Sequence, residues 1–309
     1  MPKAKAPNNR TIDTSLEQGG DYLSRCRQVS LPVQDISQLE NNVIWGDTFN
    51  TLPLLPPESV DLMIVDPPYN LTKQYDSGTF NRRKEEEYQK YTRSWMELAV
   101  PLLKTGGTIY VCCDWKSSLV IAPVLREFFT LRNRITWQRE KGRGAQANWK
   151  NGMEDIWFAT KGDGYTFCLD QVKLRRKVMA PYRAGGKPKD WVEDEKGNYR
   201  DTCPSNFWDD ITVPFWSMPE NTPHPTQKPE KLMAKLILAS SRPGELVFDP
   251  FLGSGTTAVT AKKLGRKYLG IEASGQYCVW AQQRLEMAET QKEIQGYRNG
   301  IFWQRNSGK

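Results

Sequence analysis

Short apolar runs alternate with amphipathic stretches along most of the chain. The apolar runs have the length of buried strands, and the amphipathic stretches have the spacing of helices packed on one face. The alternation predicts a doubly wound, mostly parallel α/β sheet with an antiparallel pair at one edge. The expected strands are residues 43–45, 60–65, 108–113, 131–137, 154–160, 245–249 and 267–271, and the expected helices are residues 48–55, 88–103, 116–129, 232–240, 258–264 and 274–290.

The sequence Asp66-Pro67-Pro68-Tyr69 directly follows the strand predicted at residues 60–65. Its two prolines lack N–H donors and stop the strand, which leaves backbone carbonyls free to accept hydrogen bonds. Asp66 and Tyr69 therefore stand at the carboxyl end of a strand, the edge of an open α/β sheet at which ligands bind. A carboxylate, a free carbonyl and an aromatic face suit the binding of a planar amino group and its ring.

A second strand, turn and helix occur near the end of the chain. Asp249 ends a strand, Gly253 and Gly255 follow in a turn, and Glu272 ends the next strand. Glycines let the backbone approach a ligand closely, and the carboxylate of Glu272 can accept hydrogen bonds from two ribose hydroxyls. The third glycine of the dinucleotide-binding motif is missing, so this stretch alone is equally consistent with ordinary turn glycines.

Four segments lack regular periodicity. Residues 1–20 are expected to form a flexible tail, with a phosphate-binding arm as the alternative. Residues 70–87 are polar and are expected to form a solvated loop that can close over the neighbouring Asp66 motif. Residues 161–222 are rich in proline, glycine, tryptophan and basic residues and are expected to form an irregular surface insertion. Residues 291–309 are a C-terminal tail without an assigned role.

Composition limits the class of protein. The chain has 309 residues, a net charge of +7 and a pI of about 9.0, which suits an anionic partner or simply a basic surface. Six dispersed cysteines and a single histidine argue against a structural zinc site, and no metal is expected. No apolar run has the length of a membrane span and no signal peptide is recognised, so a cytoplasmic location is expected.

The two motifs together resemble those of the S-adenosylmethionine-dependent DNA amino-methyltransferases of restriction–modification systems. In that family Asp-Pro-Pro-Tyr is the catalytic motif, and a Phe-x-Gly-x-Gly turn, here Phe251, Gly253 and Gly255, binds the cofactor. The catalytic motif comes first in this chain, which is the order of the family's beta group. The resemblance implies a Rossmann-like fold in permuted order, with a catalytic half at residues 21–160, a target-recognition region at 161–222 and a cofactor-binding half at 223–290.

The resemblance also implies roles for individual residues. The catalytic residues would be Asp66, Pro67, Pro68 and Tyr69, and the cofactor S-adenosylmethionine would be bound by Asp47, His224, Thr226, Lys228, Asp249, Phe251, Gly253, Ser254, Gly255, Thr256 and Glu272. His224 could instead act as a general base. The target base would stack on Tyr69, with Trp137 as a second face. DNA would be contacted by Arg139, Lys141, Arg143, Lys173, Arg175, Arg176, Lys177 and Arg183.

The implied reaction is transfer of a methyl group to the N6 amine of adenine in duplex DNA after base flipping. Asp in the first motif position favours adenine in this family, and N4 of cytosine is the alternative. An RNA or protein glutamine methyltransferase, a DNA-binding protein without activity and a nicotinamide dehydrogenase are weaker alternatives. Double-stranded DNA is the expected partner, together with a cognate restriction endonuclease, and the protein is expected to be a monomer or a homodimer associated with the nucleoid.

Overall fold

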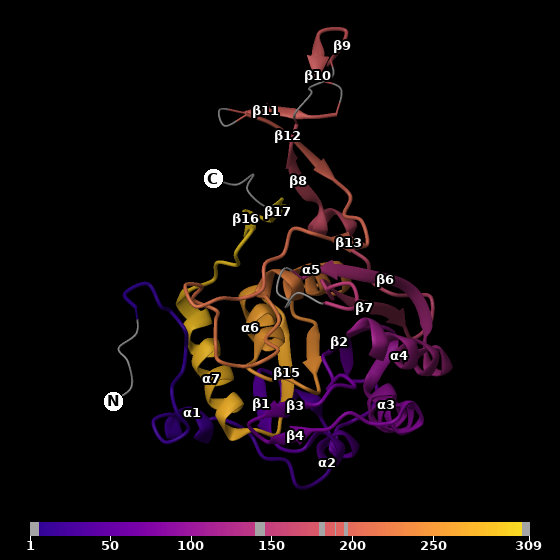
Figure 1. The fold of residues 1–309 in the computed structure, drawn as a ribbon, viewed down its shortest axis with the longest axis vertical. Helices are drawn as coiled ribbons and strands as arrows, with labels where there is room; N and C mark the ends of the chain where they lie inside the picture. Colours follow the sequence, from indigo (N-terminus) through magenta and orange to yellow (C-terminus); the bar gives the residue numbers. More distant parts are fainter. Residues whose placement is uncertain (1–5, 140–145, 179–182, 189, 195–196, 305–309) are drawn as a thin grey trace.

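The computed structural model describes residues 6–139, 146–178, 183–188, 190–194 and 197–304. Its centre is an eight-stranded sheet of order β1-β15-β14-β2-β5-β7-β6-β13 (Figure 1). The first five strands run parallel, β7 is antiparallel to both of its neighbours, and β13 is parallel to β6. The predicted doubly wound fold is confirmed. The strands are β1 (Asn42–Trp45), β2 (Val60–Val65), β5 (Leu103–Cys113), β6 (Thr130–Gln138), β7 (Met153–Thr160), β13 (Phe207–Trp208), β14 (Leu246–Asp249) and β15 (Lys267–Glu272).

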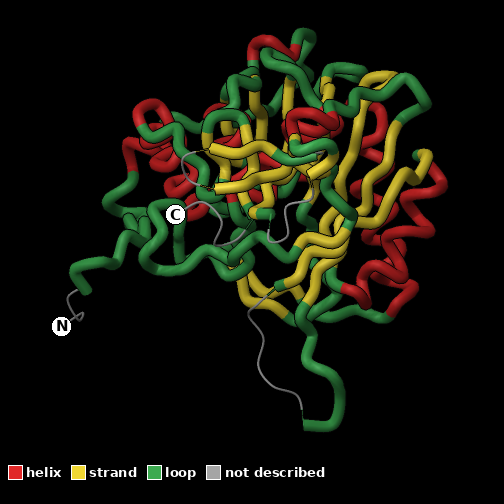
Figure 2. The backbone as a smooth tube through the Cα atoms, turned by 90° about the horizontal axis from the view of Figure 1, so that it is seen from above, coloured by secondary structure: helices red, strands yellow, loops and turns green. Residues whose placement is uncertain are grey.

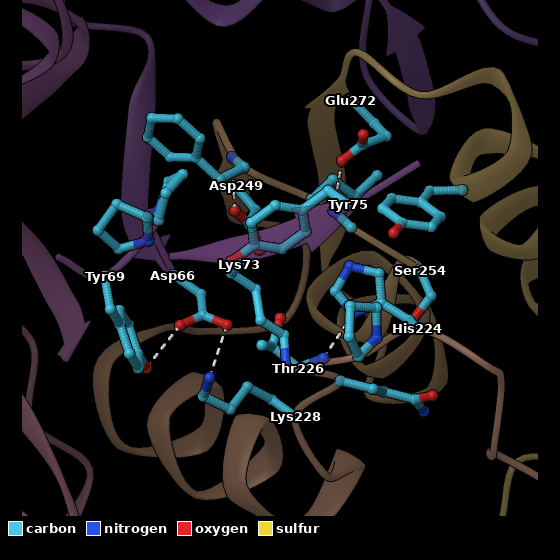
Figure 3. Close-up of a pocket in the computed structure, with 18 of the residues that line it drawn as sticks. Asp66, Tyr69, Lys73, Tyr75, His224, Thr226, Lys228, Asp249, Ser254 and Glu272 are labelled. Carbon is cyan, nitrogen blue, oxygen red and sulfur yellow. Dashed lines mark hydrogen bonds and ion pairs between the residues drawn. The ribbon is translucent and has the colours of Figure 1, made fainter. Parts of the chain in front are cut away.

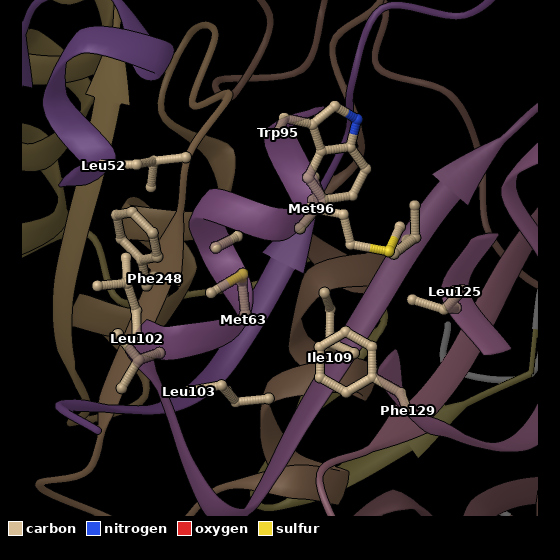
Figure 4. Packing of buried hydrophobic residues seen from close by; sticks show 14 of the residues in the cluster. Leu52, Met63, Trp95, Met96, Leu102, Leu103, Ile109, Leu125, Phe129 and Phe248 are labelled. Carbon is tan, nitrogen blue, oxygen red and sulfur yellow. The ribbon is translucent and has the colours of Figure 1, made fainter. Parts of the chain in front are cut away.

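Helices cover both faces of this sheet (Figure 2). On one face Trp95, Met96 and Leu125 are buried against Met63 and Ile109 of the strands (Figure 4). Truncating a buried aromatic side chain such as that of Trp95 costs about 3–5 kcal/mol. The helices are α1 (Gly20–Ser24), α2 (Thr48–Thr51), α3 (Glu85–Ala99) and α4 (Trp115–Phe128), and, on the opposite face from α3 and α4, α5 (Glu230–Ser240), α6 (Thr256–Lys263) and α7 (Gly275–Thr290).

The middle of the sheet contains a switch in chain direction. Strands β14 and β2 are neighbours, but α6 leads from β14 to β15 on one side, whereas α3 leads from β2 to β5 on the other. In open α/β sheets the crevice at such a point, outside the carboxyl ends of the strands, is where ligands bind. Asp66 and Asp249 follow or end these two neighbouring strands, so the fold brings the two sequence motifs together.

The boundary between α3 and β5 differs from the expected one. The helix ends at Ala99 and a 3-10 turn (Val100–Leu102) follows, so β5 begins at Leu103. Gly106 and Gly107, which fall between the expected helix at 88–103 and the expected strand at 108–113, lie inside the strand, where the pairing with β2 shifts register. Gly106 has a φ of +79°, and a Cβ there would lie 2.7 Å from the Gly164 carbonyl oxygen. The glycines therefore permit an irregularity within a strand. In the sequence alone, the same glycines resemble the end of a helix because they interrupt its periodic pattern.

The insertion and the C-terminal segment form one second sheet, which corrects the expectation of an irregular insertion followed by a separate tail. Its strand order is β11-β12-β8-β17-β16, and it extends away from the main sheet (Figure 1). β17 pairs in parallel with β8, placing Phe302 opposite Leu174. The strands are β8 (Leu174–Lys177), β11 (Val192–Asp194), β12 (Gly197–Thr202), β16 (Tyr297–Arg298) and β17 (Ile301–Trp303), and a separate hairpin is formed by β9 (Arg183–Ala184) and β10 (Lys187–Pro188).

Buried contacts fasten this second sheet to α5. Phe302 is fully buried against Leu174 and Leu238 of α5. The Lys231 ammonium donates to the backbone carbonyl of Trp303 at 2.8 Å and to that of Asp210 at 2.9 Å. Because the ammonium is itself buried, these hydrogen bonds replace those that it makes to water in the unfolded chain.

The N-terminal segment, expected to be flexible, packs on the protein from residue 9 onwards. The N–H groups of Arg10 and Ile12 donate to the carbonyls of Trp216 and Asn221 at 2.7 and 2.8 Å. Ile12 is buried, and the carbonyl of Thr14 accepts from the Trp280 indole at 2.9 Å. The segment has few apolar residues, so its order comes from backbone contacts that periodicity does not report.

In the described ranges no helix is long and apolar enough to cross a membrane. Among the same residues no group of three or more His, Cys, Asp or Glu side chains could hold a metal ion.

Candidate active site

A cavity of about 360 Å³ opens at the carboxyl ends of β2, β14 and β15 (Figure 3). All four residues of the Asp66-Pro67-Pro68-Tyr69 motif line it. So do most of the residues expected to bind the cofactor, namely Asp47, His224, Thr226, Lys228, Asp249, Phe251, Gly253, Ser254, Thr256 and Glu272. Residues from both halves of the chain therefore meet in one pocket. Gly255 is not part of the lining.

The Asp66 carboxylate is held on both of its oxygens. The Tyr69 hydroxyl donates to Oδ1 at 2.9 Å, and the Lys228 ammonium donates to Oδ2 at 2.7 Å. Burial raises the pKa of Asp66, and Lys228 opposes that effect. Burial favours the neutral amine of Lys228, but the attraction of Asp66 and Glu154 outweighs it and raises the pKa of Lys228. Lys228, which was expected to bind the cofactor, lines the pocket and is paired with the Asp66 carboxylate.

Glu154 is a pocket residue that sequence reasoning missed. Its Oε2 lies 3.2 Å from the Tyr69 hydroxyl and 3.4 Å from the Lys228 ammonium, and its Oε1 accepts from the Arg139 guanidinium. Its side chain is only 5% exposed. The direction of β7 would have revealed it. Because β7 runs antiparallel to β5, the first residues of β7 lie at the ligand-binding edge of the sheet. Arg139, expected to bind DNA, lines the same pocket.

The glycine turn after β14 is shaped by close contacts. Gly253 and Gly255 have φ values of +56° and +86°, which side-chain-bearing residues rarely adopt. A Cβ on Gly253 would lie 3.0 Å from His224 Nε2, and one on Gly255 would lie 2.7 Å from the Ala281 Cβ. The buried Arg284 guanidinium donates to the Ser254 carbonyl at 2.8 Å from beneath. The turn is therefore fixed on α7 and against the pocket.

Two carboxylates stand at the ends of β14 and β15. Asp249 accepts from the Thr257 hydroxyl at 2.6 Å, and Glu272 accepts from the N–H groups of Gly253 at 2.8 Å and Ser274 at 2.7 Å. Burial raises the pKa of each to about 7, against these hydrogen bonds. Both groups can therefore accept from hydroxyl or amino groups of a ligand, most strongly when ionised.

His224 is a neutral pocket residue. Burial and the neighbouring Lys228 lower its pKa to about 3. Its Nδ1 accepts from the N–H of Thr226 at 3.4 Å, so Nε2 carries the proton and faces the glycine turn. Its ring packs edge-on against Tyr277, with centroids 4.4 Å apart. A neutral His224 whose Nε2 is a donor, held by Thr226 and Tyr277, is better suited to the expected contact with the cofactor than to a general-base role.

The segment after Tyr69 forms a hairpin rather than an open loop. It consists of β3 (Lys73–Tyr75) and β4 (Gly78–Phe80), and the Tyr75 side chain projects into the pocket (Figure 3). At its tip the N–H of Asp76 donates to the Tyr277 hydroxyl at 3.0 Å, and the Asp76 carboxylate accepts from the Ser274 hydroxyl at 2.6 Å. These contacts join the hairpin to the start of α7.

Trp137 does not lie in the pocket, contrary to its expected stacking role. It is 1% exposed, and its indole N–H donates to the Ile211 carbonyl at 3.1 Å. Its position in β6 turns the side chain into the core beneath the sheet edge. Of the expected DNA contacts, Lys141 and Arg143 lie outside the described residues. Lys173, Arg175, Arg176 and Lys177 lie on or beside β8, and Arg183 lies on β9, so the second sheet and its neighbouring hairpin carry them.

The model of one protein family, described as DNA methylase, matches residues 60–283. This chain belongs to the N6/N4 DNA methylase family. It is 33% identical over 255 residues to the type II methyltransferase M.HpaI of Haemophilus parainfluenzae, covering 80% of this chain and 75% of that one. It is 34% identical over 253 residues to the DNA adenine methyltransferase YhdJ of Escherichia coli K12, covering 80% and 83%. This DNA methylase therefore uses S-adenosylmethionine as its cofactor.

Solved structures show the same fold. The complex of M1.HpyAVI with S-adenosylmethionine has a TM-score of 0.54 and 24% identity, covering 79% of this methylase and 98% of that chain. The PvuII DNA methyltransferase, described as cytosine-N4-specific, has a TM-score of 0.57 and 16% identity, covering 81% and 92%. YhdJ is described as an adenine methyltransferase and the PvuII enzyme as cytosine-N4-specific, so these similarities do not decide between adenine and cytosine.

Proposed function

We propose that this methylase transfers the methyl group of S-adenosylmethionine to the N6 amine of adenine at specific sites in duplex DNA. The observation that carries the proposal is the Asp66 carboxylate, fixed at the pocket edge beside the prolines that follow β2. Asp at this position favours adenine in the beta group, and one relative is described as a DNA adenine methyltransferase. The N4 amine of cytosine is the alternative, because a carboxylate can accept from either amine.

Asp66 and Pro67 would act on the nucleophile. An exocyclic amine is a weak nucleophile because its lone pair is delocalised into the ring. Hydrogen bonds donated by the two N–H groups of the amine to the Asp66 carboxylate and the Pro67 carbonyl would direct that lone pair towards the methyl group. The Pro68 carbonyl already accepts from the Tyr88 hydroxyl at 3.0 Å, whereas among the described residues no hydrogen bond reaches the Pro67 carbonyl. S-adenosylmethionine supplies the activated methyl group when bound.

The pocket residues fit this cofactor. The buried Asp249 and the half-buried Glu272 offer acceptors for hydroxyl and amino groups, and the Gly253 turn lets a ligand approach the backbone. His224 and Thr226 face the same space. A base inside a duplex cannot reach Asp66, so it must leave the stack, at a cost of a few kcal/mol. The ring of Tyr69, which lines the pocket, would stack on the extruded base.

The product predicted by this proposal is N6-methyladenine. Duplex DNA from an unmethylated host is incubated with the enzyme and labelled S-adenosylmethionine, digested to nucleosides and separated by chromatography. We expect the label in N6-methyladenine. Label in N4-methylcytosine would overturn the adenine assignment while leaving the role of Asp66 in place, and sequencing of the modified sites would give the recognition sequence.

We propose that the second sheet binds the DNA backbone. Because its basic side chains would neutralise phosphates, the affinity for DNA should fall as the salt concentration rises. On β8 the Arg175 guanidinium is paired with Asp201 through two 2.7 Å hydrogen bonds, while Lys177 is exposed. Neutralising Arg176 and Lys177 together should lower the slope of log affinity against log salt by about 0.9 for each DNA phosphate that the protein no longer neutralises. Arg175 should contribute less because its charge is already compensated.

The control for this measurement is a pair of exposed lysines on the far side of the molecule. Lys84 directly precedes α3 and Lys90 belongs to it, both are exposed, and α3 lies away from the second sheet (Figure 1). Changing both to glutamine removes the same charge and should leave the slope unchanged. Equal slopes for the wild type and both double variants would show that DNA lies elsewhere.

We further propose a cognate restriction endonuclease as partner, since M.HpaI is described as a type II methyltransferase.

A further inference from the structure

Glu154 shares both hydrogen-bonding partners of the Asp66 carboxylate, Tyr69 and Lys228. The Tyr69 hydroxyl lies 2.9 Å from Asp66 Oδ1 and 3.2 Å from Glu154 Oε2. A hydroxyl carries one proton, so Tyr69 can donate to only one of these carboxylates at a time. The Lys228 ammonium is likewise shared, at 2.7 Å from Asp66 and 3.4 Å from Glu154.

Within the described ranges, the cluster around Asp66 contains two carboxylates and two cations, so its charges compensate one another. The Asp66 side chain is 17% exposed and that of Glu154 is 5% exposed, and among the described residues Lys228 and Arg139 are the cations paired with these two carboxylates. A lysine paired with Asp66 alone would draw electron density from that carboxylate and weaken it as an acceptor for an amine. Glu154 shares the lysine and so preserves the acceptor strength of Asp66. Glu154 also gives the Tyr69 hydroxyl a second acceptor when an amine occupies Asp66 Oδ1.

We infer that Glu154 is a positioning residue for methyl transfer, acting through Tyr69 and Lys228 on the Asp66 carboxylate. This inference rests on the role proposed above for Asp66. Glu154 is anchored for this purpose by Arg139 at the start of the β6–β7 connection, and it projects from the rigid β7 strand. Buried networks of this kind hold their members in one arrangement only when every partner is present.

The test compares Glu154→Gln with Asp155→Asn. Asp155 is the next residue of β7, is 2% exposed, and pairs with Thr136 and Arg134 away from the pocket. Both changes remove one buried charge from one strand. We expect Glu154→Gln to lower the single-turnover methylation rate by about 100-fold, the size of effect produced by a misplacement of about 1 Å. The dissociation constant for S-adenosylmethionine should stay unchanged, and Asp155→Asn should change neither quantity.

A second variant and an epistasis measurement separate positioning from folding. Glu154→Asp keeps the charge but withdraws the carboxylate by one methylene, so the rate should fall while cofactor binding persists. In a Tyr69→Phe background Glu154→Gln should cost less than in the wild type, because part of its action passes through that hydroxyl. Wild-type rates in both Glu154 variants, strict additivity with Tyr69→Phe, or a parallel loss of cofactor binding would each overturn the inference.

Asp66→Asn is assayed alongside to keep this test separate from the proposed function. An active Asp66→Asn would show that the proposed role of Asp66 is wrong. An inactive Asp66→Asn with a fully active Glu154→Gln would leave the proposed function standing and remove only the role of Glu154.

Discussion

Asp66→Ala is expected to abolish methyl transfer while leaving S-adenosylmethionine binding largely intact. The carboxylate is proposed to act on the incoming amine, whereas the groups expected to hold the cofactor, Asp249 and Glu272, belong to other strands. Without Asp66 no buried acceptor at that position would orient the lone pair of the amine. The measurement is transfer of labelled methyl groups to duplex DNA, together with cofactor binding by calorimetry.

Removing Asp66 also affects Lys228, which is 5% exposed and, among the described residues, would retain Glu154 as its one carboxylate partner. Asp66→Asn is therefore the companion variant, because it keeps the volume and can still hydrogen-bond to Tyr69 and Lys228. Both variants should be inactive and should bind the cofactor. Persistent turnover in either one would mean that the amine is held by another group, and loss of cofactor binding in both would make Asp66 a structural residue of the pocket.

Glu272→Ala is expected to weaken S-adenosylmethionine binding by about 1.5–3 kcal/mol, the range for a hydrogen bond to a charged acceptor. This corresponds to roughly a tenfold to hundredfold rise in the dissociation constant. Besides the proposed ribose contact, the change removes the acceptor for the N–H groups of Gly253 and Ser274. Glu245→Ala, a change of the acid just before β14, is the matched control and should not alter binding. An unchanged dissociation constant in Glu272→Ala would remove this residue from the cofactor site.

The same two carboxylates predict how cofactor affinity depends on pH. Burial raises the pKa values of Glu272 and Asp249 to about 7, so both are largely protonated well below that pH and ionised well above it. The ionised forms accept hydrogen bonds more strongly, and affinity should therefore rise as pH increases through this pKa. Glu272→Gln cannot ionise and should flatten part of this dependence. Calorimetric titrations at several pH values check it, and a pH-independent affinity would contradict it.

The sequence was sufficient to locate the pocket because its signals are local. Asp66 and Glu272 follow or end apolar runs long enough to be recognised as strands, and parallel strands place their carboxyl ends at one edge. The position of Glu154 in the pocket could not be predicted without the direction of β7, which is set by its partner β5 rather than by its own residues. Trp137 was misplaced for a related reason, because the face to which a strand residue points depends on the whole sheet.

The second sheet was beyond prediction from local patterns. Its strands are short, β17 having three residues and β16 two, so they carry no measurable alternation. The pairing of Phe302 with Leu174 joins segments from distant parts of the sequence. Such pairings are stabilised by tertiary burial, here of Phe302 against α5, rather than by propensity.

The strand order of the main sheet has a consequence for how the chain is synthesised. β1 and β2 are close in sequence but are separated in the sheet by β14 and β15, which leave the ribosome much later. Until β14 has emerged, the apolar β2 has one open edge, a surface that invites pairing with other chains, and until β15 has emerged, β1 has no strand partner in the main sheet. Loop closure over this distance must precede completion of the sheet. Fragments ending before β15 should therefore aggregate rather than fold, and the two halves of the enzyme should be active only as one chain or when expressed together.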